Sequence, residues 1–292
     1  MDFVDDTSKA NSVAAVNEKQ KELLQNAILG IVNKNNFKKN TRSSKYIGIS
    51  LVVISVIICI SIFVFLDNAI HENKQESFKT NFLIQNLRGD TMDTWVSWKI
   101  SEGDSFHVHV INSKYATEER LNAIRDVIMS TKEYEIDDSL LHKGPKGMSS
   151  TYYAGWMGAL NSINSTTSSP IPKNLHFHVT DRGEGNILID LSNLSHPDGY
   201  SGFTTAVIDE NEHQILKSRI TIYNIEKLDI SQLETIVLHE LGHGFGLAHS
   251  SAPEDLMAPE ITTPYPYISE CDLDAITLLY DGGQQSTVIC KR

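Results

Sequence analysis

Hydrophobic and polar residues follow patterns that predict a mixture of strands and helices. Residues 106–110 read FHVHV and residues 175–179 read LHFHV, and both alternate with the period of a half-buried strand. Further strands are expected at residues 186–191, 203–209 and 219–223. A helix is expected to begin after Thr117, which is a suitable N-cap residue. Glu118 and Glu119 suit the first turn of that helix. Its buried face is expected at Leu121, Ile124 and Ile128. A second helix is expected over residues 150–163. Strands interspersed with helices predict an α+β fold, a mixed sheet packed on helices.

One segment, residues 46–66, is predominantly apolar and lacks any charged side chain. A helix of this length covers the hydrocarbon core of a bilayer, about 30 Å, so the segment predicts a transmembrane helix. The alternative is a cleaved signal peptide, but the long polar tail before the segment argues against it. Basic residues are denser before the segment than after it, which predicts a cytoplasmic N-terminus. They are Lys34, Lys38, Lys39, Arg42 and Lys45 on one side, and Lys74 and Lys79 on the other.

The apolar segment divides the chain into four expected parts. Residues 1–45 form a cytoplasmic polar tail, residues 46–66 the membrane helix, residues 67–92 a stalk, and residues 93–292 an extracytoplasmic domain. The net charge of −12 is uneven, because the tail carries eight Lys and Arg against five Asp and Glu, whereas the chain beyond the membrane segment carries seventeen against thirty-two. This acidity argues against a nucleic-acid partner.

The three cysteines fit an extracytoplasmic domain. Cys59 lies in the apolar segment, which leaves Cys271 and Cys290 as a pair that either forms a disulfide or remains two free thiols.

The strongest chemical signal is HELGHGFGLAH, residues 239–249. A helix is expected to begin near Ser231, where Ser231 and Glu234 have the spacing of a capping box. His239 and His243 then lie four residues apart on one helix face and can reach a single zinc ion. Gly246 stands where the helix should stop, free to adopt a left-handed conformation that brings His249 back as a third ligand.

Three nitrogen ligands leave a fourth position for water, as a catalytic zinc site requires. Glu240 lies beside the ligands and is expected to act as the general base in peptide-bond hydrolysis. The partner is then a peptide or protein substrate. Two alternatives remain: a non-catalytic or latent module that only binds a partner, and a zinc amidase with a non-peptide substrate.

The motif resembles that of the metzincin zinc metallopeptidases, and most closely the matrixins. Met257 fits their Met-turn, eight residues beyond His249, where it supports the site without ligating the metal. Residues 268–276 resemble the last helix of the family, residues 185–189 its third strand, and residues 202–209 the edge strand that holds an extended substrate. The resemblance covers residues 150–282, and implies a twisted five-stranded mixed sheet. Tyr265 and Tyr267 are expected to line the specificity pocket.

The chain departs from the matrixin pattern in several places. His196 and Asp198 resemble part of a second, structural zinc site, but Ala206 and residues 219–224 supply no further histidine, so we do not expect that zinc. Calcium near Asp198 is weakly supported, because one carboxylate is too few for that ion. No cysteine lies between Cys59 and Cys271, so a cysteine-based latency device is not expected.

Two further pairs of histidines share strand faces. They are His107 with His109, and His176 with His178. Either pair can bind a metal if the strands come together, but without a third ligand in view we interpret them as surface or packed side chains.

Overall fold

The computed structural model describes residues 77–141 and 143–290, all within a compact unit, Lys74–Arg292. The expected cytoplasmic tail and membrane helix, residues 1–45 and 46–66, lie outside the described residues. Within the described ranges, no helix is both long and apolar enough to cross a bilayer.

The centre of the unit is a mixed sheet with strand order β10-β1-β8-β9-β7-β3-β6, and β2 pairs with β1 at one end. The strands of this sheet are β1 (Phe78–Asn86), β2 (Thr91–Met92), β3 (Phe106–Ile111), β6 (Leu175–Thr180), β7 (Ile187–Leu191), β8 (Gly202–Asp209), β9 (Gln214–Ile222) and β10 (Glu260–Ile261). A separate antiparallel hairpin joins β4 (Glu133–Asp137) to β5 (Ser149–Tyr153). Within residues 77–141 and 143–290 the main sheet therefore has eight strands, and the five-stranded expectation was wrong.

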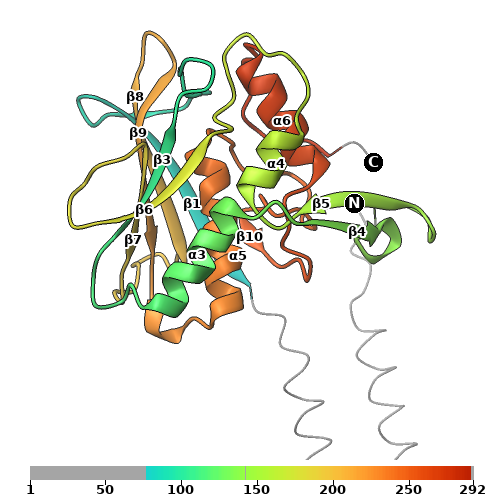
Figure 1. The fold of residues 1–292 in the computed structure, drawn as a ribbon, viewed down its shortest axis with the longest axis horizontal. Coiled ribbons are helices and arrows are strands. Elements are labelled where there is room, and N and C mark those ends of the chain that lie inside the picture. Colours follow the sequence, from blue (N-terminus) through green and yellow to red (C-terminus); the bar gives the residue numbers. More distant parts are fainter. Residues whose placement is uncertain (1–76, 142, 291–292) are drawn as a thin grey trace, which may run out of the picture. The chain divides into compact units, whose positions relative to one another are not determined.

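Helices α3 (Glu118–Met129) and α5 (Ile230–Gly244) lie on one side of this sheet (Figure 1). Helix α3 packs on β6 and α5, and α5 packs on β8 and β9. Alternate residues of β3, namely Phe106, Val108 and Val110, are fully buried in the same core as the apolar faces of both helices. The period-two pattern in the sequence thus correctly identified the inward face of this strand.

Two local predictions were wrong in detail. Residues 150–153, expected to begin a helix, belong to strand β5, and α4 covers only Trp156–Ser162. Two adjacent tyrosines, Tyr152 and Tyr153, are buried in this strand, since aromatic residues suit a pleated surface. The cap of α5 is Asp229 rather than Ser231, because the Asp229 carboxylate accepts from the Gln232 amide and the Gln232 side chain accepts from the Asp229 amide.

The predicted stalk also ends earlier than the sequence suggested. Residues 78–86, placed in the stalk, form β1 inside the main sheet, parallel to β8. Two of its three buried positions are polar, Thr80 and Asn86, so the strand carries no clear hydrophobic alternation. The Asn86 side chain is accommodated because its oxygen accepts from the amides of Arg88 and Asp90 in the following turn.

The remaining helix, α6 (Glu270–Tyr280), has the capping pair expected from the sequence. Ser269 accepts from the Asp272 amide, and the Asp272 carboxylate accepts from the Ser269 amide at 2.8 Å. Cys271 at the start of α6 forms a disulfide with Cys290, which resolves the alternative left open by the sequence.

Candidate active site

Helix α5 and the turn after it bring three histidines together. His239 and His243 are fully buried on one face of α5, and His249 is partly buried in the segment that follows. One ring nitrogen from each of these residues lies within 4.8 Å of the other two. The three residues that the spacing of the motif singled out therefore converge on one point.

Hydrogen bonds fix which nitrogen of each α5 histidine is available. His239 Nδ1 lies 2.7 Å from the Leu256 carbonyl oxygen, and His243 Nδ1 lies 2.7 Å from the Leu247 carbonyl oxygen. A carbonyl oxygen only accepts, so both Nδ1 atoms carry the proton and both Nε2 atoms present a lone pair. Such outer hydrogen bonds orient metal-ligating imidazoles.

Burial keeps these imidazoles neutral. Loss of solvent lowers the pKa of His239 to about 3 and that of His249 to about 4, and it lowers the pKa of His243 well below its usual value. Neutral imidazole is the form that binds a metal. The His239 and His243 Nε2 atoms are 3.0 Å apart with no proton between them, an arrangement that a cation stabilises. The donor set, three neutral nitrogens, fits zinc.

Glu240 lies next to these ligands and is fully buried. Its Oε2 accepts a hydrogen bond from the Thr204 hydroxyl of β8, whereas its Oε1 has no hydrogen-bond partner among the described residues. Burial raises the pKa of Glu240 to about 8, and the Thr204 hydrogen bond opposes that rise. Gly202 at the start of β8 allows this approach, because a Cβ there would collide with the Glu240 carboxylate.

The turn after α5 has the conformation expected from its glycine. The helix ends at Gly244, and Gly246 adopts a φ of +105°, where a Cβ would also collide with the Val96 carbonyl oxygen. The chain then reverses, and His249 is returned to the site.

Met257 is fully buried in a turn shaped by Asp255, whose carboxylate accepts from the Met257 amide at 2.9 Å. The other carboxylate oxygen of Asp255 accepts from the Ser269 hydroxyl at 3.0 Å. Asp255 thus ties the Met257 turn to the cap of α6.

Strand β1 also reaches the three histidines. The Thr80 hydroxyl lies 2.8 Å from His239 Nε2 and 3.3 Å from His249 Nε2, and the Phe82 ring stacks on His243 with centroids 4.8 Å apart. Because β1 pairs with β8 from Gly202 to Ile208, β8 is not an edge strand, and the expectation of a free edge was wrong.

A cavity of about 600 Å³ lies beside the site. Its lining includes Phe82 of β1, Trp95, His249 and the C-terminal segment 284–287. Side chains of a bound molecule therefore have room next to His249.

Tyr265 and Tyr267 pack on a small cluster with Tyr152 and Ile136, and Tyr267 stacks on Tyr134. Their role in a specificity pocket stays a prediction.

The His196 ring lies among aromatic side chains. Its neighbours are Tyr200, Phe203 and Tyr223, while Asp198 is exposed. Calcium near Asp198 also stays a prediction.

Fold and site together resemble those of the matrixin metallopeptidases. Residues 157–281 match the family model described as Matrixin. Over 133 residues the chain is 31% identical to matrix metalloproteinase-25 of Homo sapiens, an alignment that covers 38% of this chain and 23% of the relative. The chain thus spans about a quarter of that relative's length. The resemblance inferred from the motif is confirmed.

Sequence reasoning missed the residues that contact the site from elsewhere in the fold. No sequence motif marks these residues, which are Thr80, Phe82 and Thr204. Only the pairing of their strands brings them into contact with side chains of α5. Asp255 offered a weak signal, since an aspartate two residues before the turn methionine is well placed to accept its amide.

Proposed function

We propose that this protein is a membrane-anchored, zinc-dependent endopeptidase. The observation that carries the proposal is the convergence of three neutral imidazoles on one point, with the buried Glu240 next to His239 on the same helix. His239, His243 and His249 would hold the ion. When bound, zinc supplies a Lewis acid that polarises the scissile carbonyl and lowers the pKa of water.

Glu240 is the group that moves the proton. Its free Oε1 is the acceptor for a proton from the attacking water, while the Thr204 hydroxyl holds Oε2 in place. The same carboxyl group then passes that proton to the leaving amine. One side chain thus serves as base and then as acid.

The substrate strand would pair with β8. An extended peptide adds to a sheet through main-chain hydrogen bonds, and β8 runs past Glu240 at Gly202 and Thr204. In the described structure β1 already pairs with β8 and places Thr80 and Phe82 on the ligands. We infer that this is a latent form, and that hydrolysis requires β1 to leave β8.

The membrane anchor rests on the sequence alone. The uncharged run of residues 46–66 and the basic residues before it support a single span with a cytoplasmic N-terminus. The disulfide between Cys271 and Cys290 supports an oxidising, extracytoplasmic location for the domain.

The test uses the full chain carrying Leu83→Pro, which removes a main-chain donor from β1, loaded with zinc and given a mixed peptide library. We expect cleavage by this chain and none after a further Glu240→Ala substitution, with zinc content unchanged. Glu234→Ala is the matched control on the same helix, and it should leave cleavage intact. Equal cleavage with and without Glu240 would refute the assigned base.

The other two functions give different results in the same assay. Bound zinc without cleavage of any peptide, together with tight capture of a peptide, would favour a binding module. Release of ammonia from a non-peptide amide, without peptide cleavage, would favour an amidase.

A further inference from the structure

A second cluster of histidines lies on the outer face of the sheet. His107 and His109 are two residues apart on β3 and therefore point to the same side, opposite to the buried Phe106, Val108 and Val110. Strand β6 pairs with β3 in parallel, and its register places His178 directly opposite His109. The pairing supplies the third histidine that the pair on β3 lacked.

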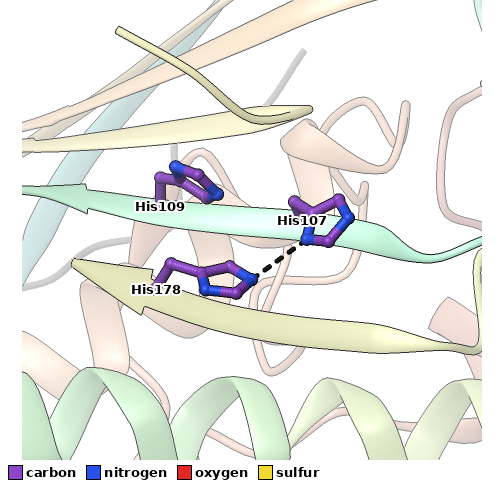
Figure 2. A group of neighbouring side chains, drawn as sticks. All are labelled: His107, His109 and His178. Atoms are coloured by element: carbon purple, nitrogen blue, oxygen red, sulfur yellow. Dashed lines mark hydrogen bonds between the residues drawn. The ribbon is translucent and has the colours of Figure 1, made fainter. Parts of the chain in front are cut away.

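The three side chains converge closely. One ring nitrogen from each lies within 4.8 Å of the other two, and His107 Nδ1 is 3.0 Å from His178 Nε2. The His178 ring centroid is 5.1 Å from that of His107 and 4.7 Å from that of His109. Figure 2 shows His107 and His109 on one strand and His178 on its neighbour, with a hydrogen bond between His107 and His178.

One nitrogen of this cluster lacks a partner. His109 Nδ1 is buried and forms no hydrogen bond with any described residue. The backbone at Gly185 covers the same ring, since a Cβ there would lie 2.9 Å from His109 Cγ and Cδ2. An unpaired, enclosed ring nitrogen costs free energy unless it binds something.

The loop that lies against His109 is fixed to β3. The Asn186 side chain accepts from the His107 amide at 2.8 Å, and the Asn186 amide donates to the His107 carbonyl at 2.9 Å. The position of His107 and His109 is therefore set by strand pairing and by this loop together. A site held by rigid elements loses little entropy when it binds an ion.

We propose that His107, His109 and His178 form a transition-metal site that binds zinc and links β3 to β6. Imidazole nitrogens suit zinc, copper and nickel, whereas calcium requires oxygen ligands. Burial and the neighbouring imidazoles lower the pKa of His107 and His109, which favours the neutral form that binds a metal. This cluster shares no residue with the His239, His243 and His249 group.

His176 provides the matched control. It lies on the same strand as His178 and opposite His107, but its Nε2 is 3.1 Å from the Asn174 side-chain oxygen, and it is not part of the convergent group. Because His178 is exposed, His178→Gln should leave the fold intact.

The experiment measures zinc bound per full chain at buffered free zinc, using zinc salt alone as the probe. We expect two ions for the parent and for His176→Gln, and one ion for His178→Gln and for His107→Gln. Zinc should also raise the midpoint of thermal unfolding less for His178→Gln than for His176→Gln. Circular dichroism spectra that match the parent show that the variants are folded.

Two ions in His178→Gln, or loss of an ion in His176→Gln, would overturn the assignment. His243→Gln separates the two sites. If the parent binds one ion that is lost only in His243→Gln, the outer site does not exist. If the parent binds one ion that is lost only in His178→Gln, the outer site stands and the proposed catalytic site fails.

Discussion

At the level of single residues, the carbonyl partners of two ring nitrogens determine what the buried histidines can bind. Leu256 and Leu247 accept from Nδ1 of His239 and His243, and this leaves both Nε2 lone pairs facing one point. The motif alone predicted the ligands, because helical spacing places residues i and i+4 on one face. It did not predict the accepting carbonyls, which come from chain segments that only the tertiary fold brings near.

The turn at Gly246 offers a residue-level prediction. Gly246→Ala places a methyl group on a residue with a φ of +105° and also brings it against the Val96 carbonyl oxygen. Gly282→Ala has the cost of a positive φ but no collision, because nothing lies within 4 Å of its Cβ. Backbone strain costs about 1–3 kcal/mol in both. We expect Gly246→Ala to lower the free energy of unfolding, measured in urea, by clearly more than Gly282→Ala. Equal losses of unfolding free energy would show that the Val96 carbonyl does not oppose the new side chain.

At the level of elements, strand β1 lies against the three histidines of the motif. It pairs with β8 on one side and with β10 on the other, and its Thr80 and Phe82 side chains touch the histidines. The sequence did not reveal this strand, because two of the three positions it buries, Thr80 and Asn86, are polar. A period-two pattern is visible only where burial and hydrophobicity coincide.

The same reasoning explains which other elements could be predicted. Strands β3 and β6 and helix α3 were identified because their inward positions are apolar, as at Val108, Leu175 and Ile124. The register between β3 and β6 was not, since strand pairing is set by contacts across the fold rather than along the chain. For this reason the sequence showed two histidine pairs but not the cluster of three.

A proline substitution in β1 tests its effect on activity. Leu83→Pro removes a main-chain hydrogen-bond donor from the middle of β1. Leu87→Pro is the matched control. Residue 87 is the second position of a turn in which the Gly89 amide donates to the Asn86 carbonyl, and proline is favoured at that position. We expect Leu83→Pro to raise the initial rate of peptide hydrolysis about tenfold or more, since about 1.4 kcal/mol of weakened pairing corresponds to that factor. No gain over Leu87→Pro would show that β1 does not restrain the enzyme.

At the level of the whole described unit, the C-terminal segment returns to the site. The Ala248 amide donates to the Ser286 carbonyl, and Ser250 forms a bridge with Val288. The disulfide between Cys271 and Cys290 then joins this segment to α6. The loop that carries His249 is therefore held by the last residues of the domain.

Removing the disulfide should weaken the unit as a whole. The bond closes a loop with a sequence separation of 19, for which chain entropy contributes about 3 kcal/mol. We expect the double variant Cys271→Ser and Cys290→Ser to lose about this much free energy of unfolding in urea. Cys59→Ser is the control, since it removes a thiol but leaves the pair. A double variant as stable as the control would contradict the stabilising role.

The most direct test of the proposed peptidase is hydrolysis of a peptide library in water enriched in oxygen-18. The full chain carrying Leu83→Pro is loaded with zinc, and mass spectrometry identifies new carboxyl termini with and without a zinc chelator. The account predicts internal cleavage, one heavy oxygen at each new terminus, and loss of cleavage with the chelator. Cleavage that persists with the chelator, or zinc-loaded protein that cuts no peptide bond, would contradict it.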